Sequence, residues 1–113
     1  MNLNEYQAAA RTTRFEQTKG INKGYSALGL TGEAGEVADK VKKIIRGDFD
    51  EKTPEELQEY KLEIAKELGD VLWYVAAVAD DLNIGLDVVA QSNLDKLRSR
   101  QDRGALQGSG DNR

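Results

Sequence analysis

Apolar residues recur at intervals of three and four along the chain, and no stretch alternates convincingly between apolar and polar positions. This spacing is typical of amphipathic helices, and its interruptions predict four of them, over residues 4–18, 25–47, 54–82 and 86–103. The glycine-rich segment 104–113 is predicted to be a flexible tail. The expected fold is therefore all-α, with one domain over residues 1–103 and a short C-terminal tail.

Several residues indicate where these helices begin and end. Thr53, Pro54 and Glu56 form the pattern of a capping box with proline at the first helical position. Gly47 is a natural stop for the second helix, and Asp87 is a candidate cap for the fourth. In the first helix the candidate buried positions are Tyr6, Ala9, Ala10 and Phe15.

The second predicted helix has a glutamate among its core-facing positions. Its apolar stripe consists of Leu30, Ala34, Val37, Val41 and Ile44. At about 100° per residue, Glu33 falls inside the arc of this stripe and Glu36 falls on its flank. The two side chains are three residues apart and point to the same side. A carboxylate in such a position is costly unless something pairs with it.

The third predicted helix has a similar acidic pair. Its expected buried stripe consists of Leu68, Leu72, Val75, Ala79 and Leu82. Glu67, Asp70 and Tyr74 share a second face at the entrance to the apolar segment 71–79. If the two helices pack antiparallel, four carboxylates converge and repel unless cations neutralise them. Mg²⁺, or Mn²⁺ in its place, is the expected cation.

An acidic pair three residues apart usually lies on a solvated helix face, and chance pairs are expected in a chain with 20 acidic residues. Four helical glycines favour the metal site instead. Each one costs up to about 1 kcal/mol relative to alanine, which suggests close approach of another backbone or a ligand. These glycines are Gly29, Gly32, Gly35 and Gly69.

The composition of the chain limits which metal ligands and which partners are expected. The chain has no cysteine and no histidine, so carboxylate oxygens are left as metal ligands. A net charge of −4 argues against a general nucleic-acid binder. The sequence begins without a signal-peptide pattern, and its longest apolar run, 71–79, is too short to cross a membrane. We therefore expect a cytoplasmic protein without nucleic-acid or membrane partners. At 113 residues, self-association is also expected.

The acidic pairs and their neighbours resemble the MazG-like nucleotide pyrophosphohydrolases. The segments LGLTGEAGEV at 28–37 and ELGDVLWY at 67–74 match the family pattern E-x-x-E followed by E-x-x-D. The resemblance implies an all-α four-helix-bundle core completed by dimerisation, often paired further into tetramers. It also implies hydrolysis of nucleoside triphosphates to monophosphates and pyrophosphate, with Mg²⁺ held by Glu33, Glu36, Glu67 and Asp70.

The resemblance also suggests substrate contacts in the last helix. Asn93, Lys96 and Arg100 match a family motif and share one helix face, where the two cations would neutralise phosphate oxygens. A solvated basic face is the equally weighted alternative. Tyr74 is the candidate to stack on a base, and Glu36 the candidate to accept a proton from water.

Other functions remain open at this stage. The related all-α dUTP and phosphoribosyl-ATP pyrophosphohydrolases share the metal chemistry, and the sequence does not separate these substrates. A non-catalytic helical oligomerisation or regulatory module would keep the fold without the activity. The 30-residue gap between the two acidic pairs is long for the family pattern, so the loop 48–54 is a candidate specificity insert.

Overall fold

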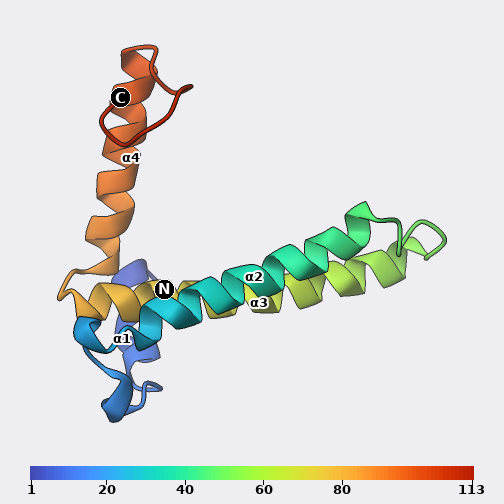
Figure 1. The fold of residues 1–113 in the computed structure, drawn as a ribbon, viewed down its shortest axis with the longest axis horizontal. Helices are drawn as coiled ribbons and strands as arrows, with labels where there is room; N and C mark the ends of the chain where they lie inside the picture. Colours follow the sequence, from blue (N-terminus) through green and yellow to red (C-terminus); the bar gives the residue numbers. More distant parts are fainter.

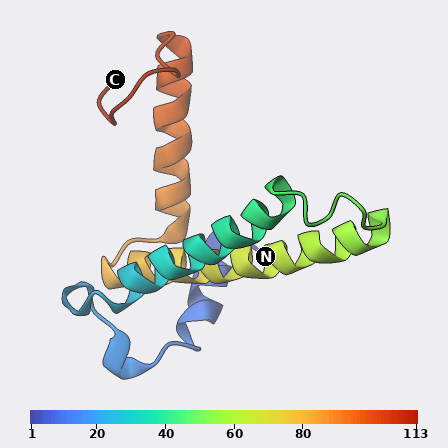
Figure 2. The same ribbon diagram turned by 45° about the vertical axis from the view of Figure 1, so that its right-hand side comes forward.

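The computed structural model describes all 113 residues and contains four α-helices and no strand. They are α1 (Leu3–Arg11), α2 (Tyr25–Ile45), α3 (Pro54–Asp81) and α4 (Leu86–Asp102), with the short 3-10 helices η1 (Glu16–Thr18) and η2 (Ile21–Lys23) between α1 and α2. Helices α2 and α3 form a long antiparallel hairpin, α1 crosses its base, and α4 stands away from it (Figures 1 and 2). The predicted all-α class is confirmed. None of the helices is both long and apolar enough to span a bilayer.

The ends of α2 and α3 follow the local signals in the sequence. The Thr53 hydroxyl accepts a hydrogen bond from the Glu56 amide at 3.1 Å, and the reciprocal contact completes the predicted capping box. Helix α2 ends two residues before Gly47, which has a φ of 98°. Glycine reaches this left-handed conformation without strain, which lets the Asp48 amide bond to the Lys43 carbonyl at 3.1 Å.

Helix α1 is shorter than predicted. It ends at Arg11 instead of continuing to residue 18. The hydroxyls of Thr12 and Thr13 each donate to the carbonyl three residues earlier, at 2.7 Å. Such local bonds compete with helix continuation. Phe15, predicted to be buried on this helix, lies beyond its end and is 65% exposed.

The predicted cap of α4 by Asp87 is wrong. The N-cap position is Gly85, and side chains of α1 satisfy the first amides of the helix. Gln7 Oε1 accepts from the Leu86 amide at 2.8 Å, and Asn4 Oδ1 accepts from the Asp87 amide at 3.1 Å. These long-range bonds fix the start of α4 to α1, so the direction of α4 depends on α1.

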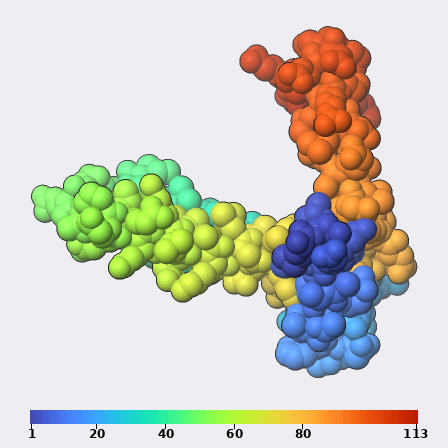
Figure 3. Space-filling view, turned by 180° about the vertical axis from the view of Figure 1, so that it is seen from behind, coloured from blue at the N-terminus to red at the C-terminus, as the bar shows by residue number.

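The apolar core of one chain is very small. Its buried apolar residues are Ala76, Ala77, Ala79 and Leu86. The predicted buried stripe of α3 is wrong at Leu68, Leu72 and Leu82, which are 53%, 39% and 48% exposed. The radius of gyration is 17.4 Å, whereas a compact domain of this length has about 13 Å. Figure 3 shows the resulting open shape, with the hairpin and α4 as separate arms. Closure of the helical core by a second chain therefore remains a prediction.

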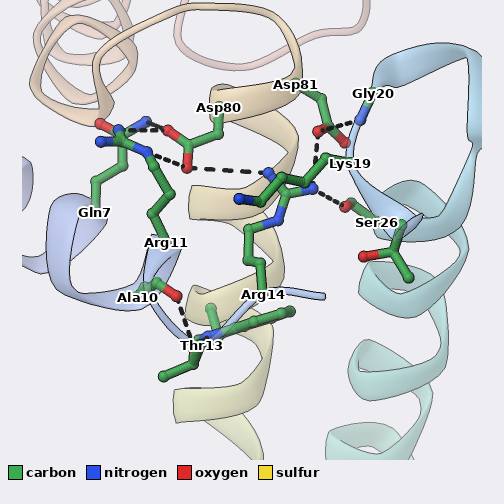
Figure 4. A network of polar contacts seen from close by, with 12 residues as sticks. Gln7, Ala10, Arg11, Thr13, Arg14, Lys19, Gly20, Ser26, Asp80 and Asp81 are labelled. Atoms are coloured by element: carbon green, nitrogen blue, oxygen red, sulfur yellow. Dashed lines mark hydrogen bonds and ion pairs between the residues drawn. The ribbon is translucent and has the colours of Figure 1, made fainter. Parts of the chain in front are cut away.

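A buried ion pair joins the elements at the base of the hairpin (Figure 4). The Arg14 guanidinium donates to Asp81 Oδ1 at 2.8 Å and to the Ser26 hydroxyl at 3.0 Å. Both charged side chains are only 3% exposed. The Gly20 amide donates to the same Asp81 oxygen at 2.9 Å. The pair thus ties the connection after α1 to the start of α2 and the end of α3.

A second set of contacts extends this base to the turn before α4. Gln7 Nε2 donates to Asp80 Oδ1 and to the Ile84 carbonyl, both at 2.9 Å. Arg11 forms two hydrogen bonds to the Asp80 carboxylate, at 2.9 and 2.8 Å. Together with the Arg14 pair, these contacts define what we call the polar base: Gln7, Arg11, Arg14, Ser26, Asp80 and Asp81.

We predict that Asp81→Asn destabilises the protein by about 3 kcal/mol at neutral pH, because it leaves the Arg14 charge buried without its counter-ion. Burial raises the pKa of Asp81, but the Gly20 amide, Arg14 and Ser26 outweigh this effect and hold the pKa below its ordinary value of 3.8. A lowered folded-state pKa adds stability above the unfolded value, and this stability is lost as the pH falls through the folded value.

The difference in denaturant unfolding free energy between wild type and variant should therefore be constant above about pH 5 and shrink below about pH 4. Asp95→Asn is the control, because Asp95 is exposed and its carboxylate accepts a hydrogen bond only from Gln91. Equal stability of Asp81→Asn and wild type at pH 7 would contradict the assigned role of the buried pair.

Candidate metal centre

Three of the four predicted carboxylates meet between the two long helices. Glu33 of α2 and Glu67 and Asp70 of α3 each offer an oxygen, and these oxygens all lie within 4.8 Å of one another. Glu33 and Glu67 are half-buried, and Asp70 is exposed. The antiparallel hairpin produces this group, because it sets the acidic turn of α2 against the acidic turn of α3.

Glu36 lies one turn further along α2 and is exposed, outside this group of three. It is close enough for its charge to act on Glu33. Partial burial raises the pKa of Glu33, and the charges of Asp70, Glu67 and Glu36 raise it further. The group therefore has the mutual repulsion that a divalent cation would relieve.

Lys40 is a member of this region that the sequence analysis missed. Its Nζ lies 3.7 Å from Glu67 Oε1, and both side chains are largely covered. Lys40 follows Glu36 by four residues and Glu33 by seven, so helical spacing alone places it on the acidic face. It supplies part of the charge compensation in the group, and a cation that binds there would take over that role.

The donor set fits a hard divalent cation. Mg²⁺ prefers carboxylate oxygens at 2.0–2.1 Å and keeps several waters, so neighbouring ligand oxygens around one ion lie roughly 3–4 Å apart. The three oxygens already lie within 4.8 Å of one another, so small side-chain rotations would suffice to surround an ion. Glu33, Glu67 and Asp70 would hold the ion, and the exposure of Asp70 leaves one side accessible to phosphate oxygens.

Tyr74 packs between the two helices next to the carboxylates. A Cβ atom on Gly29 would overlap the Tyr74 ring, so this glycine allows the close approach of α2 and the ring. Burial raises the pKa of Tyr74, with smaller contributions from Tyr25, Glu33 and Asp70. At Gly29 the close neighbour is thus a side chain and not the predicted backbone or ligand. At the other three helical glycines no atom of the chain lies within 4 Å, so backbone approach is absent there and the approach of a ligand stays a prediction.

The predicted substrate contacts of α4 lie apart from the carboxylates. Helix α4 rises from the base of the hairpin and leads away from it (Figures 1 and 2). Lys96 and Arg100 instead contact Asp111 of the C-terminal segment, and Asn93 is exposed. One chain therefore does not bring these three side chains to the acidic group.

The fold and this site define an all-α protein with a carboxylate group suited to a divalent cation. Comparison with known proteins identifies the class: residues 25–104 match the MazG nucleotide pyrophosphohydrolase domain. The chain belongs to this family. It is also 46% identical over 120 aligned residues to Gene 37 protein of Mycobacterium phage L5, with both chains covered in full. No solved structure matches the chain.

We predict that Glu67→Gln and Asp70→Asn each weaken the binding of Mn²⁺ or Mg²⁺ by about tenfold or more, because each removes a ligand oxygen and a negative charge. Titration calorimetry on the nucleotide-free protein measures this affinity. Glu59→Gln is the matched control, since Glu59 lies on the same helix two turns away and is exposed. Affinities equal to that of the control would exclude the group as a metal site.

Proposed function

We propose that this protein is a Mg²⁺-dependent nucleoside triphosphate pyrophosphohydrolase that converts (d)NTP to (d)NMP and pyrophosphate. The observation that carries the proposal is the group of carboxylates from α2 and α3, in a chain that belongs to the nucleotide pyrophosphohydrolase family. Mn²⁺ is a suitable substitute for Mg²⁺, because both prefer oxygen ligands. We also assign the reaction to the cytoplasm.

The reaction adds water to the α-phosphorus and breaks the bond to the β-phosphate oxygen, which leaves with pyrophosphate. A bound divalent cation would neutralise phosphate charge and make water more acidic. We assign Glu33, Glu67 and Asp70 to holding the cation. Glu36 lies beside this group without belonging to it, so its carboxylate is available to accept the proton of the attacking water.

The remaining substrate contacts are proposals of the same kind. Lys96 and Arg100 would bind phosphate oxygens, Asn93 would donate to the sugar or phosphate, and Tyr74 would stack on the base. A dUTP or phosphoribosyl-ATP pyrophosphohydrolase uses the same groups, and only the substrate distinguishes it. A non-catalytic helical module would keep the hairpin without turnover.

We further propose that the active form is a homodimer, or a tetramer of two dimers. A chain with only 4 buried apolar residues has little hydrophobic stabilisation of its own. Leu68 and Leu72, four residues apart, form a short apolar stripe on α3, at 53% and 39% exposure, and Leu62 is 55% exposed elsewhere on the helix. The stripe continues into a groove of about 500 Å³ between α1, α3 and α4. A second copy would cover this surface and bring another α4 towards the carboxylates.

We predict that the wild type sediments as a dimer or larger, and that Leu68→Glu combined with Leu72→Glu yields a monomer. The change places two charges on the surface that the second copy would cover, and charges are depleted from interface cores. Leu106→Glu is the control, because Leu106 is a similarly exposed leucine outside the helices. Sedimentation of the wild type as a monomer at micromolar concentration would refute the assembly.

We expect Mg²⁺-dependent release of pyrophosphate from at least one of a panel of canonical and modified NTPs and dNTPs, with dUTP and phosphoribosyl-ATP included. Glu36→Gln and Asp70→Asn should each lower kcat/KM by about 100-fold or more, since one removes the proton acceptor and the other a metal ligand. Glu59→Gln should match wild type. If no nucleotide is hydrolysed and all four proteins are folded, the helical module is the better account.

A further inference from the structure

We propose that the C-terminal segment, residues 104–113, is a built-in competitor for the phosphate-binding side chains of α4. In this arrangement the carboxylate of Asp111 pairs with the side chains of Lys96 and Arg100. A polyphosphate must displace the carboxylate to reach these two side chains. The inference rests on the proposed function, because it takes Lys96 and Arg100 as phosphate contacts.

The segment makes direct contact with both cations. Asp111 Oδ1 lies 3.1 Å from Lys96 Nζ and 3.4 Å from Arg100 Nη2. Arg100 Nη2 also donates to the backbone carbonyls of Asp111 at 2.9 Å and Gly110 at 3.3 Å. Lys96 and then Arg100 lower the pKa of Asp111, which is therefore charged at neutral pH. One carboxylate and two carbonyls thus offer Arg100 the oxygen acceptors that a phosphate would offer.

Because the C-terminal segment covers Arg100, this side chain cannot contact the segment and bind a phosphate at the same time. Arg100 is only 4% exposed, although it lies in the last turn of α4. No other helix packs against that end of α4 in Figures 1 and 2. Its Nη2 is already committed to residues 110 and 111. A phosphate can reach this guanidinium only when the segment moves away.

The segment is held in its position by its own terminal residue. The Arg113 side chain donates to the carbonyls of Ala105, Leu106 and Gly110, and Arg103 donates to the Arg113 carbonyl at 2.8 Å. Gly108 and Gly110 have positive φ values of 123° and 86°, which allow the chain to reverse. The loop therefore closes on itself and presents Asp111 to α4.

The contact is suited to displacement. The Asp111 side chain is 85% exposed, so water and salt screen its attraction to the two cations. It has a single negative charge, whereas a polyphosphate has several and would compete effectively for the same donors. We therefore expect competition that weakens phosphate binding without abolishing it.

The test uses the full chain and inorganic tripolyphosphate without metal, so that no hydrolysis is required. Asp111→Asn should bind tripolyphosphate roughly two- to five-fold more tightly than wild type in an NMR titration. Asp102→Asn is the matched control, because it removes the same charge from exposed α4 without a contact to Lys96 or Arg100. Equal gains in the two variants would overturn the inference, since they would reflect net charge alone.

A double-mutant cycle separates the contact from general electrostatics. In a Lys96→Gln background the gain from Asp111→Asn should fall, because one of its two partners is gone. Tripolyphosphate should also move the amide signals of Gly110 and Asp111 towards random-coil positions in the wild type. An undiminished gain, or unmoved amide signals at saturation, would overturn the inference.

Turnover distinguishes this inference from the proposed function. If the protein hydrolyses a nucleotide, Asp111→Asn should lower KM by the same factor at unchanged kcat, and Asp102→Asn should not. An unchanged KM would overturn the inference while leaving the enzyme assignment intact. Tighter tripolyphosphate binding by Asp111→Asn in a protein that turns over no nucleotide would support the competing contact and refute the enzyme.

Discussion

The buried pair of Arg14 and Asp81 is the contact on which the remaining architecture depends. Apolar burial in one chain is limited to three alanines and one leucine, which cannot by themselves fix the angles between helices. The polar base supplies what the core lacks, because hydrogen bonds and ion pairs are directional. Its bonds reach α1, α2, α3, the connection through Gly20 and the turn before α4. Arg14 Nε has no hydrogen-bond partner, so this order is obtained at some cost in desolvation.

The carboxylate group follows from the same geometry. The base fixes the open end of the α2–α3 hairpin, and the tight turn after α2 fixes the other end. Between them, the Tyr74 ring lies against Gly29 and sets how closely the helices approach. Glu33 then faces Glu67 and Asp70 across the hairpin. The carboxylate group thus depends on how α2 and α3 are aligned along each other. Each of its side chains comes from a helix and not from a loop.

Local sequence signals predicted the features that local contacts determine. The capping box at Thr53 predicted the start of α3, and helical spacing predicted that Glu67 and Asp70 share one face of α3. Prediction failed where contacts distant in sequence decide the structure. The α4 start is capped by Gln7 and Asn4, about 80 residues away, and no local pattern at Asp87 contains that information. The length of α1 was predicted wrongly for the opposite reason. The apolar spacing predicted a helix to residue 18, but local hydrogen bonds of the Thr12 and Thr13 hydroxyls compete with the helix, which ends at Arg11.

The exposed apolar stripe of α3 bears on the proposed function. Periodicity places Leu68 and Leu72 on one apolar face of α3, but it does not say whether an apolar partner for that face lies in the same chain. Within one chain both leucines are exposed, and the helix that carries Asn93 and Lys96 leads away from the hairpin that holds the acidic group (Figure 1). The proposed second copy would answer both mismatches, because it would cover the stripe and supply a second α4. Under the proposed function, the metal ligands would come from the hairpin of one chain, whereas a substrate that bridges the metal and the side chains of Lys96 and Arg100 would need a second chain. Substrate affinity should then depend on protein concentration more steeply than metal affinity does.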